Sequence, residues 1–152
     1  MKCRWTIILL SVVLFLTACS SKTAAPVEIK ANEEDCDTCH MGIEDLHSAA
    51  QIILENGKPM LFDDIGCMVV YMQEHQPKYE AAFVHDFDSK EWISFDNSTF
   101  VQSKNIHSPM NYGIAAYETE KQASDMQKVQ GGEVYTVKEL LEKELKDTKH
   151  GH

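Results

Sequence analysis

The chain has 152 residues, of which 25% are charged, and its formal net charge is −10. This acidity argues against a nucleic-acid-binding function, because phosphate backbones require a basic protein surface. The length remaining after an N-terminal export signal corresponds to one domain.

The N-terminus has the features of such a signal. A short basic start precedes an almost entirely apolar run over residues 5–15, which is too short to span a bilayer but long enough for a signal-peptide core. Leu16-Thr17-Ala18-Cys19 follows and matches a bacterial lipobox, in which Cys19 is lipidated and becomes the first mature residue. We therefore predict a signal peptide over residues 1–18 and a lipid anchor on the extracytoplasmic face of a bacterial membrane.

Composition divides the rest of the chain into three parts. Residues 19–32 are small and polar, include Pro26 and predict a flexible tether. Residues 33–146 contain the apolar segments of a folded domain, and residues 147–152 are expected to form a disordered tail.

In chain order, the domain is expected to alternate strands and helices, which predicts an α+β fold with short antiparallel sheets and packed helices. The expected strands cover residues 49–54, 60–62, 81–87, 91–95, 112–117 and 133–136. The first two flank Asn56-Gly57, a strong hairpin signal. Helices are expected after an N-cap at Asp63 or Asp64, after the capping box Thr119–Gln122 and after the capping box Thr136–Glu139.

A weak internal sequence repeat indicates two related halves of ββα type. Met41-Gly42 leads into the first expected strand, and Met110-Asn111-Tyr112-Gly113 leads into the strand that ends at residue 117. A helix follows each of these strand regions. Two related halves would bring Met41 and Met110 together at the interface between them.

The number of cysteines limits what the thiols can do. Once the signal is removed and Cys19 is lipidated, three thiols remain, namely Cys36, Cys39 and Cys67. An odd number of thiols outside the cytoplasm argues against a framework made only of disulfides. At least one thiol should therefore stay free, bind a ligand or pair with another chain.

Residues 36–41, with the sequence Cys-Asp-Thr-Cys-His-Met, carry the strongest chemical signal. Cys39 and Met41 are two positions apart, so an extended segment would direct both sulfur atoms the same way. Thiolate and thioether sulfur are soft ligands that together favour Cu(I). Met110 follows a proline in a tight segment and is a candidate for a third sulfur ligand.

The same residues admit other functions. Residues 36–40 satisfy the Cys-x-x-Cys-His pattern of haem attachment, and Met110 would supply an axial ligand, so a mono-haem c-type cytochrome for electron transfer is a serious alternative. Small cytochromes of this class are mostly helical, whereas strands dominate here.

Zinc would require four Cys or His ligands, and there is no second Cys-x-x-Cys. A thioredoxin-like dithiol opens a helix after a strand, and the polar residues 32–35 disfavour a strand. A further alternative is a metal-independent binding lipoprotein in which Cys36 and Cys39 form a structural disulfide.

The ordered combination of lipobox, Cys-x-x-Cys-x-Met, hairpin, Phe-Asp-Asp and Pro-Met-x-x-Gly resembles the NosL family, the lipoprotein accessory proteins of nitrous oxide reductase. The resemblance covers nearly all of the expected domain. It departs from the family's usual Cys-x-x-Cys-Gly-Met at His40. The matching residues are Cys36, Cys39, Met41, Phe62, Asp63, Asp64, Met68, Pro109, Met110, Gly113, Ala116 and Tyr117.

This resemblance implies a copper chaperone, which is not an enzyme, built from two related ββα-type halves. It implies that the protein binds Cu(I) and delivers it to nitrous oxide reductase or to the machinery that assembles its copper centres. By position, Cys39, Met41 and Met110 would be the ligands, with Cys36 as a further contributor. His40 or His107 would take part when copper is exchanged with the acceptor. No nucleic-acid partner is implied.

Overall fold

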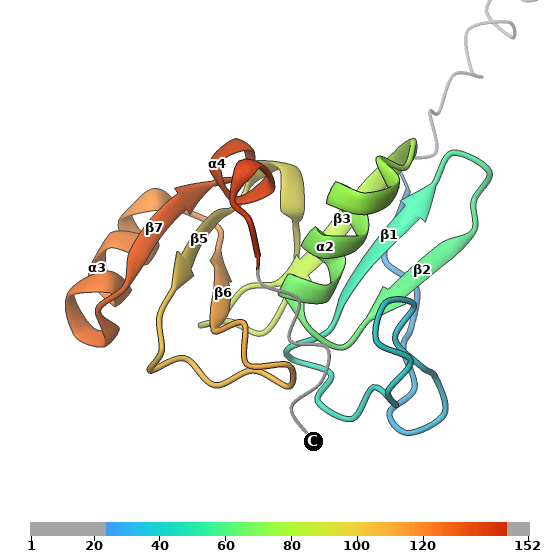
Figure 1. The fold of residues 1–152 in the computed structure, drawn as a ribbon, viewed down its shortest axis with the longest axis horizontal. Coiled ribbons are helices and arrows are strands. Elements are labelled where there is room, and N and C mark those ends of the chain that lie inside the picture. Colours follow the sequence, from blue (N-terminus) through green and yellow to red (C-terminus); the bar gives the residue numbers. More distant parts are fainter. Residues whose placement is uncertain (1–23, 146–152) are drawn as a thin grey trace, which may run out of the picture.

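The computed structural model of the chain describes residues 24–145 (Figure 1). The predicted signal peptide, the lipidation site Cys19 and the tail 147–152 lie outside the described residues. Within the described range, no helix combines the length and the apolar character needed to cross a membrane.

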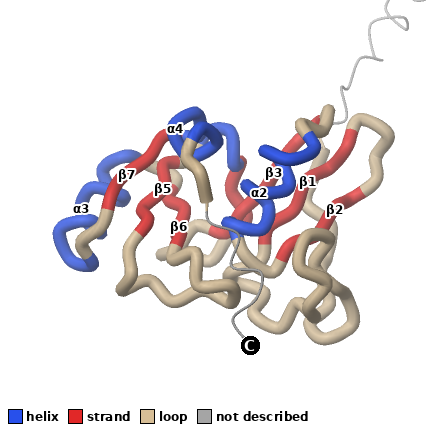
Figure 2. Tube along the Cα trace, viewed as in Figure 1, coloured by secondary structure: helices blue, strands red, loops and turns tan. Residues whose placement is uncertain are grey.

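Two antiparallel sheets and three helices make up the described part of the chain, which confirms the α+β class (Figure 2). The first sheet has the order β2-β1-β3-β4, with β1 (Ala50–Leu54), β2 (Pro59–Phe62), β3 (Tyr79–His85) and β4 (Trp92–Ser94). The second has the order β6-β5-β7, with β5 (Thr99–Gln102), β6 (Ile114–Tyr117) and β7 (Glu133–Thr136). The helices are α2 (Ile65–His75), α3 (Glu120–Gln130) and α4 (Val137–Glu142), and a 3-10 turn η2 covers Phe95–Asn97.

Two of the three helices, α2 and α4, contribute to the core that joins the two sheets. Helix α2 lies across the first sheet, α3 lies beside the second sheet on the side away from the first, and α4 lies near the junction (Figure 1). A single large apolar cluster joins Ile52 and Phe62 of the first sheet and Phe100 of the second to Met68 of α2 and Leu140 of α4. Because the two sheets share this core, the described residues form one domain.

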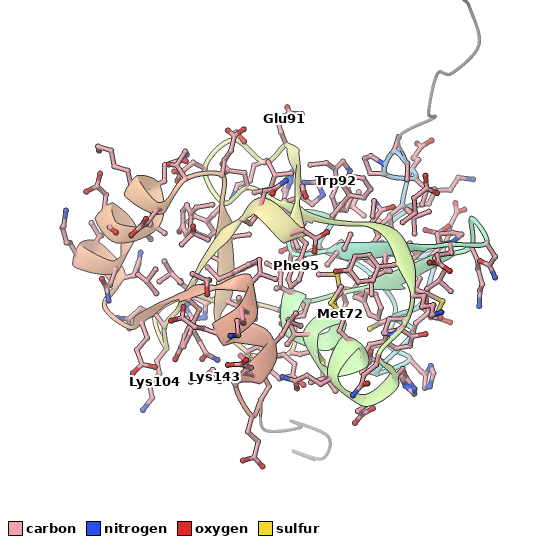
Figure 3. All side chains as sticks on the ribbon, turned by 90° about the horizontal axis from the view of Figure 1, so that it is seen from above. Met72, Glu91, Trp92, Phe95, Lys104 and Lys143 are labelled. Carbon is pink, nitrogen blue, oxygen red and sulfur yellow. The ribbon has the colours of Figure 1, made fainter. Side chains whose placement is uncertain are left out.

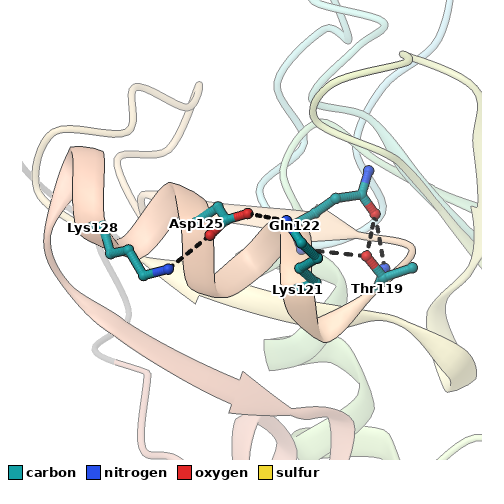
Figure 4. A network of polar contacts seen from close by, with 5 residues as sticks. All are labelled: Thr119, Lys121, Gln122, Asp125 and Lys128. Carbon is teal, nitrogen blue, oxygen red and sulfur yellow. Dashed lines mark hydrogen bonds and ion pairs between the residues drawn. The ribbon is translucent and has the colours of Figure 1, made fainter.

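Local sequence explains where the helices begin. The Asp64 side chain accepts a hydrogen bond from the Gly66 N–H at 2.8 Å and caps α2. Of the two predicted N-cap residues, Asp63 and Asp64, the N-cap is therefore Asp64. Both predicted capping boxes are present, at Thr119 and at Thr136. Figure 4 shows the first of them on the exposed helix α3, where Lys121 and Lys128 also pair with Asp125 at 2.6 and 2.8 Å.

The central strand of the second sheet, β5, was missing from the sequence prediction. Phe100 faces the main core and Val101 faces a second cluster around Tyr117 and Ala123, and both are completely buried. A four-residue strand that is buried on both faces lacks the apolar–polar alternation by which strands are detected.

The two faces of β1 show how the N-terminal segment joins the domain. Ile52 faces α2, whereas the buried Gln51 faces away from it and exchanges hydrogen bonds with the Val27 N–H and carbonyl at 2.7 and 3.1 Å. On this second face Ile29 belongs to a small apolar cluster with Ile43 and Trp92. Contacts of the domain therefore extend N-terminally to residue 27, and all three apolar clusters lie within residues 29–145.

Asp86 connects the two sheets at the end of β3. Its Oδ1 accepts hydrogen bonds from the Asp88 and Ser89 N–H groups at 3.1 and 2.8 Å, and its Oδ2 accepts one from the Glu118 N–H at 3.0 Å. Burial by itself raises the pKa of this carboxyl group, but these hydrogen bonds outweigh it and lower the pKa.

The two predicted halves correspond to two successions of strand, strand and helix, namely β1-β2-α2 and β5-β6-α3. That the two halves are related stays a prediction.

Candidate metal centre

The Cys-x-x-Cys segment forms a closed turn. The Cys36 N–H donates to the Met41 carbonyl at 2.8 Å, and the His40 N–H donates to the Cys36 carbonyl at 2.9 Å. His40 has a φ of 60°, which lies in the left-handed region. The expectation that Cys39 and Met41 lie in an extended segment is therefore wrong, because the backbone reverses direction between Cys36 and Met41.

The turn brings two thiols beside two groups, Asp63 and Cys67, that the sequence did not predict as ligands. One ligand atom from each of Cys36, Cys39, Asp63 and Cys67 lies within 4.8 Å of all the others. Asp63 directly precedes the N-cap of α2 and Cys67 lies in its first turn, so the helix start supplies half of the cluster. The signal for Cys67 was the odd number of thiols, but its distance of 28 residues from Cys39 hid the contact.

The three thiols are free and differ in environment. Cys36 and Cys67 are buried, whereas Cys39 is only partly buried. A hydrogen bond with Cys67 lowers the pKa of Cys36 to about 7, although burial alone would raise it. The same hydrogen bond and burial raise the pKa of Cys67, and burial raises the pKa of Cys39 to about 12. Cys36 is therefore the thiol that ionises most readily, with Cys67 as its hydrogen-bond donor.

Asp63 adds a carboxylate that the cluster leaves half satisfied. Its Oδ2 accepts a hydrogen bond from Cys39 Sγ at 3.5 Å. Its Oδ1 is buried and has no hydrogen-bond partner among residues 24–145. A buried carboxylate oxygen without a donor is unfavourable, so a cation close to the three thiols would relieve that cost.

Asp64, the next residue in the chain, attaches the segment that contains Met110 to the start of α2. Its Oδ2 accepts hydrogen bonds from Ser108 Oγ at 2.6 Å and from the Met110 N–H at 3.0 Å. Burial raises the pKa of this carboxyl group, and the hydrogen bonds oppose the shift. The segment also packs directly on the helix, since a Cβ atom at Gly66 would lie 2.0 Å from a ring carbon of Tyr112. The Asp63-Asp64 pair thus joins the cysteine turn to the Met110 segment.

The two candidate methionine segments meet at an open pocket of about 470 Å³. Met41, with 56% of its surface exposed, lines this pocket together with Asp63 and Pro109. Met110 and Cys39 are both partly buried and both pack against the main core. The structure therefore brings Cys36 and Cys39 together in one cluster and places Met41 beside the segment that carries Met110. His107 lines the pocket, and His40 is exposed.

Replacing His40 by glycine should stabilise the protein. The left-handed conformation costs a residue with a Cβ atom roughly 1 kcal/mol, whereas glycine adopts it freely. We therefore expect His40→Gly to raise the free energy of unfolding by about 0.5–1 kcal/mol in urea denaturation. His107→Gly is the matched control, because His107 is also exposed but is not among the residues of positive φ. A gain at His107 that equals the gain at His40 would contradict this explanation.

Comparison with known proteins identifies the family and the fold of this chain. The family model NosL matches residues 26–145, which is most of the chain. Among solved structures, the chain is similar to the crystal structure of the copper chaperone NosL from Shewanella denitrificans, with a TM-score of 0.64 and 17% sequence identity. The match covers 76% of this chain and 96% of that chain, and at this identity it establishes the fold. No match was found among curated proteins. The extent of the family match shows that the chain belongs to the NosL family.

Proposed function

We propose that this protein is an extracytoplasmic copper chaperone that binds Cu(I) and delivers it for the maturation of nitrous oxide reductase. The observation that supports this most is the cluster of three free thiols, which lies beside a buried, half-satisfied carboxylate and next to a pocket lined by Met41. Soft sulfur ligands favour Cu(I) over harder divalent ions. Membership of the NosL family supports the same function.

In this proposal Cys39 is the central ligand, since it belongs to the thiol cluster and is still partly exposed. Met41 and Met110 complete the sulfur set, and Cys36 contributes from the buried side. An exposed methionine at the rim of the pocket lets an acceptor displace one ligand at a time. Transfer by ligand exchange makes and breaks no bond within a substrate, so the protein is not an enzyme.

The lipobox at residues 16–19 supports a lipid anchor at Cys19, with the domain on the extracytoplasmic side of a bacterial membrane. The acceptor is the reductase itself or the machinery that assembles its copper centres. Copper delivery at that face requires no nucleic-acid contact, which agrees with the net charge of −10.

The haem alternative has less support. Covalent attachment would need both cysteines of the Cys-x-x-Cys-His pattern at the haem edge, but Cys36 has no exposed surface and hydrogen-bonds with Cys67. Expression with a cytochrome maturation system should therefore yield protein without covalent haem absorbance. Covalent haem on the purified protein would favour the cytochrome and overturn the chaperone proposal.

Removing the Met110 thioether should weaken Cu(I) binding. In competition with a Cu(I) chelator, we expect the wild-type protein to bind one Cu(I) ion and Met110→Leu to bind it about 10–100-fold more weakly. Leucine is nearly isosteric, so the packing of Met110 on the main core is kept. Met126→Leu is the control, because Met126 is also partly buried but packs on the second apolar cluster. Equal affinities for the two variants would remove Met110 from the ligand set.

A further inference from the structure

A pair of histidines lies outside the sulfur cluster, on the face of the first sheet opposite α2. His47 belongs to the loop before β1, and His85 is the last residue of β3. Their ring centroids are 5.8 Å apart with an interplanar angle of 84°. None of the roles assigned to the cysteine turn or to the Met110 segment uses either side chain.

The hydrogen bonding of His85 fixes which ring nitrogen carries the proton. Its Nδ1 lies 2.7 Å from the Lys90 carbonyl oxygen, which can only accept a hydrogen bond. Nδ1 therefore carries the proton, and the lone pair of the neutral ring is on Nε2. A carbonyl that holds the remote N–H in this way is the usual outer partner of a metal-bound histidine.

Packing holds His85 in place. Its ring lies 3.7 Å from that of Trp92, centroid to centroid, and Trp92 is its register partner on β4. Trp92 in turn packs against the cluster formed by Ile29 and Ile43. Figure 3 shows Trp92 on the side of the first sheet away from α2.

A tight turn holds the backbone of His47. Its N–H donates to Asp45 Oδ1 at 3.0 Å, and Ser48 Oγ donates to Asp45 Oδ2 at 2.7 Å. The Asp45 carboxylate places a negative charge beside both rings, and burial lowers the pKa of His85, which favours the neutral ring that a metal ion requires. Asp45 also lines the pocket that contains Met41, so the histidine pair adjoins the proposed copper site.

We infer that His47 and His85 form a second metal site, which takes Cu(II). With metal–nitrogen bonds of about 2.0 Å, two imidazoles on one ion have centroids roughly 4.5–6.3 Å apart, depending on the angle at the metal. The observed 5.8 Å lies within this range. Among the divalent ions that imidazole binds, Cu(II) forms the most stable complexes, and water would complete its coordination. The sulfur cluster selects Cu(I), so the two sites differ in the oxidation state that they accept.

Tryptophan fluorescence tests this site locally. A chain beginning at Ser20 keeps all three apolar clusters and has Trp92 as its only tryptophan. The thiols are first saturated with Ag(I), so that they neither bind nor reduce Cu(II), and His150 and His152 are replaced by asparagine in every sample. Addition of one equivalent of Cu(II) should then quench Trp92 and give a Cu(II) electron paramagnetic resonance spectrum with coupling to two nitrogen atoms.

His47→Asn is the decisive variant, because His47 is exposed and its backbone supplies the hydrogen bond to Asp45. We expect it to weaken Cu(II) binding about 10–100-fold, while Cu(I) binding by the thiols stays unchanged. His75→Asn is the control, since His75 lies at the end of α2 and its ring contacts Tyr71. Quenching that is absent in the parent chain, or equal in the two variants, would overturn the site without affecting the Cu(I) proposal.

Discussion

Replacing Cys39 by serine is expected to lower the Cu(I) affinity by about 100-fold or more, since losing an outer hydrogen-bond partner of a metal ligand alone costs 10–100-fold. Cys39 Sγ lies within 4.8 Å of the ligand atoms of Cys36, Asp63 and Cys67. It is also the only one of the three thiols in the described part of the chain that is not fully buried. A serine hydroxyl is a hard, poor ligand for a soft monovalent ion, so the change removes the central sulfur while keeping nearly the same shape.

Cys67→Ala is the comparison variant for this prediction. Cys67 lies deeper, at 1% exposure, and acts on Cys36 through a hydrogen bond. We expect its loss to lower the Cu(I) affinity about tenfold, the lower limit for losing an outer partner, because Cys67 acts on the contributing ligand Cys36 and not on the central ligand Cys39. Both affinities are measured by competition with the same chelator, after circular dichroism has confirmed folding. If Cys67→Ala abolished binding and Cys39→Ser did not, copper would be held by the buried thiols and our ligand assignment would be wrong.

Replacing Asp64 by alanine is expected to lower the free energy of unfolding by about 2–4 kcal/mol. Loss of a helix N-cap costs about 1 kcal/mol, and each partly buried donor left unsatisfied costs about 1–3 kcal/mol, with some relief from water. The Gly66 N–H, Ser108 Oγ and the Met110 N–H all donate to this one carboxylate. Urea denaturation measures the loss.

Asp64→Asn is the matched control, because asparagine is an equally good N-cap and keeps one oxygen that accepts hydrogen bonds. Its loss of stability should be clearly smaller than that of Asp64→Ala. The alanine variant should also bind Cu(I) more weakly, since the Met110 segment is no longer tied to the start of α2. An alanine variant as stable as wild type would show that the hydrogen bonds of Asp64 do not hold the two segments together.

The local elements could be read from the sequence where a single short signal decides the conformation. Asn56-Gly57 predicted the β1–β2 hairpin, and Gly57 has the positive φ of 81° that such a turn requires. The capping boxes at Thr119 and Thr136 predicted where α3 and α4 begin. β5 could not be found in this way, because its burial on both faces depends on the core of the second sheet and on helices from elsewhere in the chain.

The candidate site divides in the same manner. Cys36, Cys39 and Met41 were identifiable because they are adjacent in the chain, and residues 109–113 were identifiable through their resemblance to a family motif. The left-handed backbone at His40 could not be predicted from residue types, because a histidine is not a signal for a positive φ. Because this conformation favours glycine, His40 carries a conformational cost at this position of the motif.

By itself, the sequence determined the α+β class, the helix starts and the presence of soft sulfur side chains in two short motifs, because each depends on neighbouring residues. Tertiary structure alone decided that Cys67 and Asp63 join the cysteine turn and that Asp64 ties down the Met110 segment. It alone also placed His47 beside His85. These contacts join residues 24 to 46 positions apart, and only the packing of α2 and β3 in a shared core makes them close.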